Sequence, residues 1–545
     1  MHLSIASPAF GLSSTVNSST RTAVRATRGS FAQPFFRASA EKGVHCRLSM
    51  STFLKSIGIK RAELPLSPAE ALSKRPRSTI SASAGAGDAG EIPFSKVGST
   101  TRVQGLVLTS HVFQVPLDHS GEESGTVDVF VREVAAASKA NDTSLPYLIY
   151  LQGGPGFESP RPMDAGGWIG AAVERFRVLL LDQRGTGSST PVTARSLTQK
   201  GDARTQAEYL KFFRADSIVQ DAEMIRRALL PDGAKWTTLG QSFGGFCTLS
   251  YLSMFPEALE RSLITGGLAP TSEGCSADEV YTALFKRVRA QNAKYYQRFP
   301  QDVRAVQVIV QHLQSQAGGG VALPDGGILT AQGLQLLGIN FGQAGGMERV
   351  HYLMESAWDG TGELSLAFLK GYTGMLAYDT NPIYALLHES IYCNGQAEHA
   401  DPSKRASNWA AERVRRNQGS HFDASRAVED DRPVPFTGEM VFPFMFDEMA
   451  ALRPLKEVAH LLAAKEDWPA LYRSEALTKN TVPVAAAAYY EDMYVEMALS
   501  QATADQVQGT RMWVTSEYMH SGVREDGPKI FNRLVALADD EIPIR

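Results

Sequence analysis

The stretch that decides the fold is Trp236-Thr-Thr-Leu-Gly-Gln-Ser-Phe-Gly-Gly-Phe-Cys-Thr-Leu-Ser-Tyr-Leu-Ser-Met254. It begins with a short apolar run, Trp236–Leu239, and ends with another apolar segment, Phe246–Met254. Between them, Gly240-Gln-Ser-Phe-Gly244 fits the pattern G-x-S-x-G of a sharp strand-to-helix turn that projects a serine hydroxyl above a sheet. Glycines on both sides of Ser242 prevent side-chain clashes at such a turn. Because the pattern also occurs by chance, the chemistry must be argued from further residues.

Strand and helix patterns alternate on both sides of this turn. Leu106–Val115 and Thr126–Val134 predict an antiparallel pair around the turn-rich Asp118–Gly125. A helical stretch at Ser217–Leu230 places its apolar residues on one face. Short apolar runs, each followed by a Gly-rich or polar turn, lie at 146–151, 177–181, 236–239 and 262–265. Strands that alternate with helices predict a mostly parallel sheet covered by helices on both faces.

A long helical block follows Pro270, and the strand pattern resumes only at Val482–Tyr489 and Arg511–Thr515. A helical block inside the sequence of a sheet indicates a cap inserted between two late core strands. We therefore expect folded structure to begin near Val103. The predicted division is a leader and flexible linker at 1–100, a first core part at 101–270, a helical cap at 271–480 and a second core part at 481–545.

Charge is distributed unevenly along the chain. Residues 1–100 carry a net charge of +8, and the remaining 445 residues carry a net charge of −12. An acidic body without a basic stripe argues against nucleic-acid binding. No apolar stretch is long enough to predict a membrane span. The dispersed cysteines favour reduced thiols, and the sequence does not indicate an oligomeric state.

The first forty residues resemble an organelle-targeting segment. Met1 to Ala40 contains no Asp or Glu, four arginines and abundant Ser and Thr, without the compact apolar core of a secretory signal. This composition predicts a transit peptide, and its weak amphipathicity favours a plastid over a mitochondrion. A disordered tail on a cytoplasmic protein is the alternative.

A nucleophilic serine needs a base and a carboxylate that orients the base, in the chain order Ser, Asp or Glu, His for this kind of turn. The segment Tyr490-Glu-Asp-Met-Tyr494 follows a predicted strand, and either Glu491 or Asp492 could supply the carboxylate. His520 follows the last predicted strand, whereas the other histidines after Ser242 fall in the helical block. We therefore predict that Ser242 and His520 act together.

Backbone N–H groups are predicted to stabilise the negative charge that develops on a substrate oxygen. Gln152-Gly-Gly-Pro-Gly156 follows a predicted strand, so its loop can offer the amide of Gly154. The amide of Phe243, directly after the serine, would complete this oxyanion hole. Asp182-Gln-Arg-Gly-Thr-Gly-Ser188 follows another strand and is predicted to brace the loops around the site.

Together these motifs resemble the prolyl iminopeptidase family of α/β hydrolases. The resemblance rests on the segments at 152–156, 182–187, 240–246 and 263–268, and it extends from about Leu106 to Val535. It implies an α/β-hydrolase fold, with a mostly parallel sheet flanked by helices and a large helical cap inserted between late core strands. Many family members begin the oxyanion loop with His, where this sequence has Gln152.

The resemblance also implies an activity. Family members release an N-terminal residue, typically proline, from a short peptide with a free N-terminus, without a metal or organic cofactor. The family pattern matches Asp492-Met493 as the acid of the triad, and it suggests Glu389 and Glu439 as cap carboxylates that bind the substrate's amino group. An esterase or amidase with the same triad is the nearest alternative, because one fold serves many substrates. A noncatalytic homologue is a further alternative.

Overall fold

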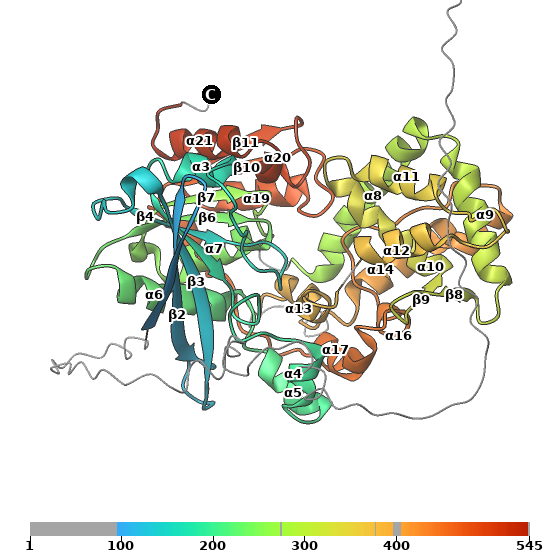
Figure 1. Cartoon of the computed structure of the whole chain (residues 1–545), viewed down its shortest axis with the longest axis horizontal. Coiled ribbons are helices and arrows are strands. Elements are labelled where there is room, and N and C mark those ends of the chain that lie inside the picture. The colour runs from blue at the N-terminus through green and yellow to red at the C-terminus, as the bar shows by residue number, and fades with distance from the viewer. Residues whose placement is uncertain (1–94, 273–274, 377, 396–404, 543–545) are drawn as a thin grey trace, which may run out of the picture. The chain divides into compact units, whose positions relative to one another are not determined.

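The computed structural model describes residues 95–272, 275–376, 378–395 and 405–542, and one nine-stranded sheet organises them (Figure 1). The predicted targeting segment lies outside the described residues. The strand order is β1-β2-β3-β5-β4-β6-β7-β10-β11. The strands are β1 (Ser95–Val103), β2 (Leu106–Pro116), β3 (Thr126–Ala136), β4 (Tyr147–Leu151), β5 (Arg177–Asp182), β6 (Trp236–Gln241), β7 (Leu259–Thr265), β10 (Val484–Tyr489) and β11 (Thr510–Thr515).

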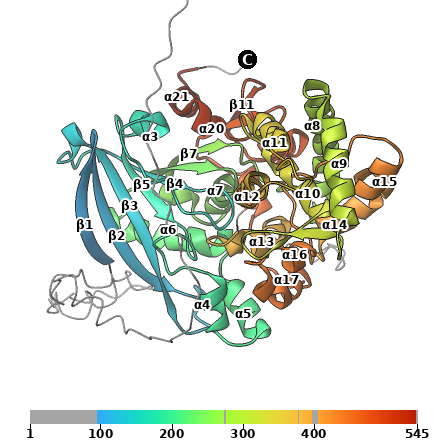
Figure 2. The ribbon, with the colours of Figure 1, turned by 45° about the vertical axis from the view of Figure 1, so that its right-hand side comes forward.

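The sheet is antiparallel at one side and parallel over the rest. Strands β1, β2, β3 and β5 pair antiparallel in that order, whereas β5, β4, β6, β7, β10 and β11 pair parallel. Strands β1, β2 and β3 are the long ribbons at the left of Figure 2. Because parallel strands end at the same edge, the turns after β4, β6, β10 and β11 meet there, and ligands bind at that edge in open α/β sheets.

Apolar residues on both faces explain why the central strands are continuous hydrophobic runs. Along β5, Leu179 and Leu181 belong to one apolar cluster, and Val178 and Leu180 belong to another. Successive side chains of a strand point to opposite faces, so both clusters must be covered by helices. Helices α6 (Ala215–Leu229) and α7 (Phe243–Met254) contribute to the first cluster, and α3 (Gly167–Ala172) and α21 (Gly527–Ala538) contribute to the second.

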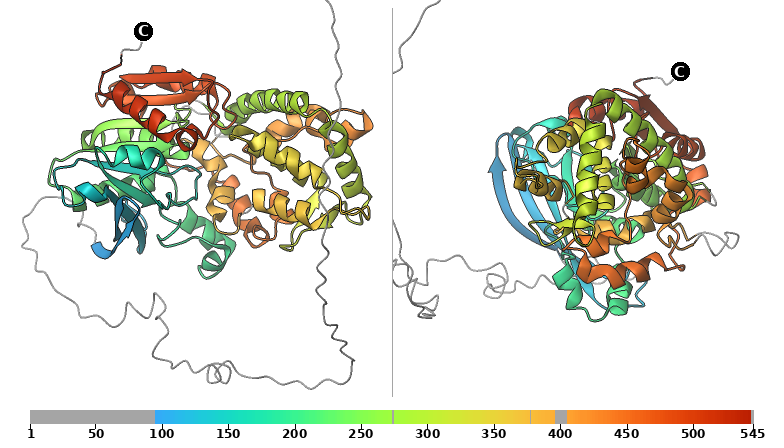
Figure 3. Two further views of the ribbon diagram at one scale, coloured as in Figure 1. Left: turned by 45° about the horizontal axis from the view of Figure 1, so that its top comes forward. Right: turned by 90° about the vertical axis from the view of Figure 1, so that its right-hand side faces the viewer.

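The chain between β7 and β10 forms the helical cap, as predicted. These helices, coloured yellow-green to orange-red, gather beside the sheet in Figure 1 and in the left view of Figure 3, and they face the viewer in its right view. They are α8 (Ala277–Arg298), α9 (Asp302–Ser315), α10 (Ala331–Gln335), α11 (Gly346–Glu355), α12 (Leu366–Met375), α13 (Pro382–Leu387), α14 (Ala410–Asn417), α15 (Ala424–Glu429), α16 (Met445–Glu448), α17 (Lys456–Ala463) and α18 (Ser474–Thr478). Among the described residues, no helix has the length and apolarity that crossing a bilayer would demand.

The remaining elements connect or flank these parts. Helices α4 (Ala194–Thr198) and α5 (Ala203–Leu210) lie between β5 and α6 in the chain, and α19 (Met497–Gln506) lies between β10 and β11. A short helix, α20 (Gly522–Glu525), follows β11, and short 3-10 turns include η3 (Leu336–Gly342) and η4 (Glu389–Tyr392).

Two strand features were not predicted from the sequence. Strand β1 begins at Ser95, so the expectation that folded structure starts near Val103 is wrong. Its residues are almost all exposed, and a strand that buries neither face has no alternating apolar pattern to detect. Inside the cap, β8 (Gly320–Ala322) and β9 (Ile328–Thr330) form a hairpin too short to give a periodic signal.

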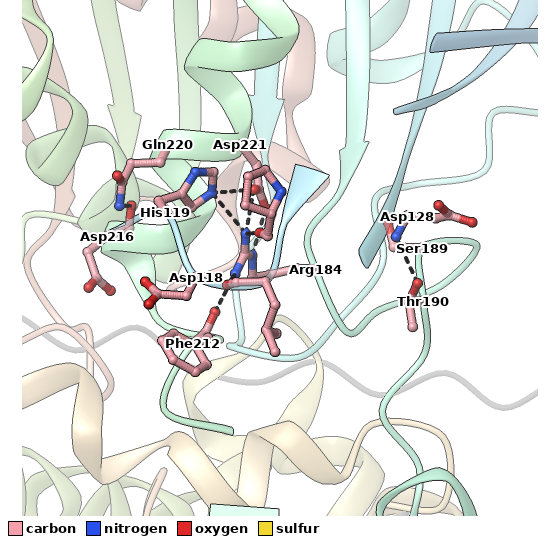
Figure 4. A network of polar contacts seen from close by, with 12 residues as sticks. Asp118, His119, Asp128, Arg184, Ser189, Thr190, Phe212, Asp216, Gln220 and Asp221 are labelled. Atoms are coloured by element: carbon pink, nitrogen blue, oxygen red, sulfur yellow. Dashed lines mark hydrogen bonds and ion pairs between the residues drawn. The ribbon is translucent and has the colours of Figure 1, made fainter. Parts of the chain in front are cut away.

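A buried arginine, Arg184, joins several loops of the core. Arg184 donates from Nε to Asp221 Oδ2 (2.7 Å) and from Nη2 to Asp221 Oδ1 (2.5 Å). Its Nη1 also donates to the carbonyls of Leu117 (2.7 Å) and Phe212 (2.8 Å) (Figure 4). Both charged side chains are almost completely buried. Arg184 thus connects the turn after β5 to the β2–β3 turn, to the end of α5 and to α6.

Removing this arginine should destabilise the fold. Arg184→Met removes both hydrogen bonds of the guanidinium group to Asp221 and leaves the buried Asp221 carboxylate with His119 (2.8 Å) as its remaining side-chain partner. Breaking a buried ion pair in this way costs up to roughly 3–5 kcal/mol. We expect Arg184→Met to lower the melting temperature clearly in a thermal denaturation experiment. The matched control is Arg227→Met, because Arg227 pairs with Glu223 while half exposed, and such pairs contribute only about 0–1 kcal/mol. Equal melting temperatures for the two variants would contradict this account.

Candidate active site

The turn between β6 and α7 holds Ser242 in a backbone conformation that side chains rarely adopt. Ser242 has φ 54° and ψ −125°. The chain packs very closely around this turn. A Cβ atom added to Gly244 would lie only 1.8 Å from the carbonyl oxygen of Leu151, at the end of β4, so this position requires glycine. Strain of this kind persists where the surrounding structure imposes it, and it is common at active sites.

His520 and Asp492 meet at the same edge of the sheet. Asp492 follows β10, His520 follows β11, and His520 Nδ1 lies 2.7 Å from Asp492 Oδ2. The other carboxylate oxygen accepts hydrogen bonds from the backbone N–H groups of Tyr494 (2.8 Å) and Val495 (3.1 Å). Both carboxylate oxygens of Asp492 therefore have hydrogen-bond partners, and the side chain is almost completely buried. Among these contacts His520 is the side-chain partner.

Glu491, the other acid of this segment, faces the cap. Its Oε2 lies 2.7 Å from Lys294 Nζ and accepts from Gln291 Nε2 (3.1 Å), and both partners are on α8. On sequence grounds either acid could have served, and only Asp492 contacts His520 in the structure.

Charges around His520 determine its proton affinity. Burial lowers the pKa of His520, but the negative charge of Asp492, their hydrogen bond and the charge of Glu439 together outweigh burial and raise it above its ordinary value. A histidine in this setting is stabilised when it accepts a proton, as a general base must be.

Backbone donors lie near Ser242. Helix α7 begins at Phe243, and the first N–H groups of a helix have no partner inside the helix. The loop after β4 supplies Gly153 and Gly154, which line the same cavity as Ser242. The backbone carbonyl of Gln152 accepts from Gln183 Nε2 (3.0 Å), so the segment after β5 braces this loop, as predicted.

A cavity of about 550 Å³ brings these groups together. Its lining includes Ser242, His520, Gly154 and Glu439, and the cap contributes residues from η3 and from the segment after α12. Pockets of this size hold small ligands. No group of three or more His, Cys, Asp or Glu residues within the described part of the chain is arranged to hold a metal ion.

Glu439 is the carboxylate of the cap that reaches the cavity. Its Oε1 accepts a hydrogen bond from the Tyr384 hydroxyl (3.0 Å). Burial raises the pKa of Glu439 to about 7, although the His520 charge and the Tyr384 hydrogen bond act in the opposite direction. A buried carboxylate with a raised pKa gains most from a cationic partner.

Glu389 does not line the cavity. Its two carboxylate oxygens accept hydrogen bonds from the backbone N–H groups of Ala410 (3.1 Å) and Ala411 (2.9 Å), the first residues of α14. Burial raises the pKa of Glu389, while these hydrogen bonds act in the opposite direction. The structure therefore brings Glu439, but not Glu389, to Ser242 and His520, and Glu389 caps a helix instead.

Comparison with known proteins places this geometry in a family. A family model described as alpha/beta hydrolase fold matches residues 146–312. The chain is 47% identical over 439 residues to a proline iminopeptidase from Aeromonas sobria, with 80% of this chain and 98% of that protein covered. The chain belongs to the proline iminopeptidase family of α/β hydrolases.

A second relative and a solved structure also match the chain. A proline iminopeptidase from Aspergillus aculeatus is 37% identical over 440 residues, with 79% of this chain and 93% of that protein covered. A crystal structure of bromoperoxidase from Bacillus anthracis aligns with 12% identity and a TM-score of 0.34, covering 78% of this chain and 99% of that one.

Gln241, Arg524 and Tyr384 are among the cavity residues that were not predicted from the sequence. Gln241 occupies the variable position before Ser242 in the G-x-S-x-G pattern, and Arg524 closes the segment that contains His520. Gln241 directly precedes Ser242, and Arg524 follows His520 by four residues, so proximity in the sequence could have indicated both. Tyr384 has no such signal, because the sequence does not reveal which cap residues face the core.

The position of Glu389 predicts a structural effect for its removal. Glu389→Ala leaves two buried N–H groups of α14 without acceptors, which should cost about 1–3 kcal/mol and lower the melting temperature. Glu429→Ala is the control, because Glu429 is exposed on α15 and should change stability little. If Glu389→Ala melts like the unmodified protein and instead weakens substrate binding, Glu389 is a substrate ligand.

Proposed function

We propose that this protein is a serine aminopeptidase that releases an N-terminal residue, preferably proline, from short peptides through an acyl-enzyme intermediate. The observation that carries the proposal is a single cavity that contains Ser242, the His520–Asp492 pair and the buried carboxylate of Glu439. Membership of the proline iminopeptidase family supports the same activity.

The proposed reaction uses groups that line the cavity, together with Asp492 and the first amide of α7. The contact with Asp492 keeps the proton of His520 on Nδ1, so Nε2 is the nitrogen that takes the proton of the Ser242 hydroxyl. Ser242 Oγ then attacks the carbonyl carbon of the substrate's first residue, and the amides of Phe243 and Gly154 stabilise the oxyanion. His520 gives its proton to the leaving amine as the C–N bond breaks, which leaves an ester on Ser242.

Water completes the cycle. His520 takes a proton from a water molecule that attacks the ester carbonyl, and it returns that proton to Ser242 Oγ as the acid product leaves. Every step uses the same base, the same oxyanion donors and the same orienting carboxylate.

Glu439 gives the site its preference for a free amino group. The N-terminal ammonium of a peptide can pair with this buried carboxylate, which Tyr384 already orients. An esterase or amidase that acts on neutral acyl groups would instead leave the carboxylate without a cationic partner. Glu389 is not included in this role, because both of its oxygens are held by α14.

The proposed acid can be tested against its neighbour. Asp492→Asn should lower kcat for proline arylamide by about 10⁴, because the imidazole loses the acceptor that fixes its tautomer. Glu491→Gln should have a far smaller effect, since Glu491 contacts Gln291 and Lys294 of the cap. Labelling with a fluorophosphonate, with Ser242→Ala as the unlabelled control, reports the same loss without a substrate. The reverse order of the two variants would show that Glu491 is the acid.

The amino-group preference predicts how blocked substrates behave. N-acetylproline arylamide should have a kcat/KM roughly 10-fold to 100-fold below that of proline arylamide, because acetylation removes the charge that pairs with Glu439. Glu439→Gln should narrow this gap, because it should lower kcat/KM only for the substrate with a free amino group. Equal hydrolysis of both substrates by the unmodified enzyme would support an esterase or amidase instead.

Glu439 also predicts a pH dependence. Its carboxyl, with a pKa of about 7, becomes neutral as the pH falls through that value, so affinity for the ammonium group is present above pH 7 and is lost below it. The kcat/KM for proline arylamide reports the free enzyme and should fall steeply on the acid side, as both Glu439 and His520 take up protons. Glu439→Gln should show a shallower acid limb, and an unchanged limb would contradict the role of Glu439.

We also propose that residues 1–40 direct import into a plastid, on the basis of their composition. A fusion of residues 1–100 to a fluorescent protein tests this proposal, and a fusion that stays in the cytoplasm or enters mitochondria would refute it.

A further inference from the structure

The charges of the cavity are not matched by an ammonium group alone. Among the described residues that line it, one is a carboxylate, Glu439, and two are arginines, Arg349 and Arg524. Complementary charges favour a substrate that carries an anionic group as well as a cationic one. A short peptide with both termini free has such a pair of charges.

Arg524 lies on the core side of the site, next to the catalytic groups. It is on α20, and its Nη2 donates to Gln241 Oε1 (3.4 Å). The amide nitrogen of the same Gln241 lies 3.5 Å from His520 Nε2, the atom that must exchange protons with the substrate. Gln241 therefore connects Arg524 to His520 and directly precedes Ser242 in the chain.

The guanidinium group of Arg524 has capacity for a ligand. Within the described part of the chain, Gln241 is the side-chain partner of Arg524, and Arg524 forms no ion pair. Its side chain is exposed and lines the cavity, so a substrate can reach it. Arginine presents a planar set of donors that fits a carboxylate with two parallel hydrogen bonds.

The direction of the reaction identifies which carboxylate Arg524 would meet. His520 protonates the leaving nitrogen, so the leaving residue must lie beside His520. In a dipeptide, the terminal carboxylate carbon is only two bonds beyond that nitrogen. A cation held beside His520 through Gln241 is therefore suited to the carboxylate of a dipeptide, and each added residue moves the carboxylate away by up to about 3.3–3.6 Å.

We propose that Arg524 binds the α-carboxylate of the leaving residue and thereby makes dipeptides with N-terminal proline the preferred substrates. This inference rests on the aminopeptidase function proposed above, with Glu439 at the amino end of the substrate and Arg524 at the carboxyl end. Both termini of a dipeptide are then bound by groups of opposite charge.

Arg349 provides a matched control because its donors are already in use. It is on α11 of the cap, and it donates from Nη1 to the carbonyl of Ala344 (3.0 Å) and from Nη2 to Gln343 Oε1 (3.3 Å). It lines the same cavity and carries the same charge, but it belongs to a different part of the fold.

The experiment compares three substrates that differ only at the carboxyl end: prolylglycine, prolylglycinamide and prolylglycylglycine. For the unmodified full-length enzyme, we expect kcat/KM for prolylglycine to exceed that for prolylglycinamide by roughly 10-fold to 100-fold, with prolylglycylglycine between them. In Arg524→Gln the ratio of the first two should fall towards one, mainly through a higher KM for prolylglycine. Arg524→Lys should retain part of the ratio, and Arg349→Gln should retain all of it.

Each other outcome overturns the inference. A ratio near one in the unmodified enzyme shows that the carboxylate is not recognised. An equal loss for prolylglycine and prolylglycinamide in Arg524→Gln shows that Arg524 only positions Gln241 and His520. A collapse of the ratio in Arg349→Gln, but not in Arg524→Gln, assigns the carboxylate to Arg349.

Proline arylamide separates this inference from the proposed function. It has the free amino group but no carboxylate, so an aminopeptidase must hydrolyse it whatever Arg524 does. Failure to hydrolyse proline arylamide and prolylglycine would reject the aminopeptidase function itself. Hydrolysis of proline arylamide, with a ratio near one for the two glycine substrates, would reject only the role of Arg524.

Discussion

The close approach of β4 to the turn between β6 and α7 is the constraint on which the site depends. Only a residue without a Cβ atom can stand at Gly244, directly against the Leu151 carbonyl. That contact fixes the start of α7 against the strand that leads into the oxyanion loop. This packing contact helps to position the serine hydroxyl and the first N–H groups of α7.

Charged side chains buried beneath the turns hold the surrounding loops. Asp182 accepts two hydrogen bonds from Arg161, Gln183 holds the Gln152 carbonyl, and Arg184 pairs with Asp221. Three consecutive residues, the last of β5 and the two that follow it, therefore contact three different neighbours. Burying charged groups is costly unless they are paired, and the pairing of Asp182 and Arg184 explains how one short polar motif can hold so much of this edge.

Most of the core strands, and the meeting of Asp492 and His520 at one edge of the sheet, could be predicted from the sequence because their signals are local. Buried parallel strands give apolar runs, and Ser242, Asp492 and His520 each follow one of these runs. The exposed strand β1 gives no such signal. The cap residues are harder to place: Glu389 and Glu439 are both acidic residues of the cap, and only tertiary packing decides that one caps a helix while the other faces the cavity. The choice between Glu491 and Asp492 likewise depends on which side chain the α8 helix attracts.

The insertion of the cap between β7 and β10 also has a consequence for synthesis. Ser242 is translated before the cap, whereas Asp492 and His520 are translated after it, and β10 must pair with β7 over Ser262 to Thr265 before the parts meet. Chain segments that are distant in sequence form their contacts late, because closing a long loop costs entropy. In the proposed mechanism Ser242 depends on His520 and Asp492, so the serine of an emerging chain has no base until the last strands are in place. A peptidase that uses this triad therefore gains its activity only after its cap has been translated.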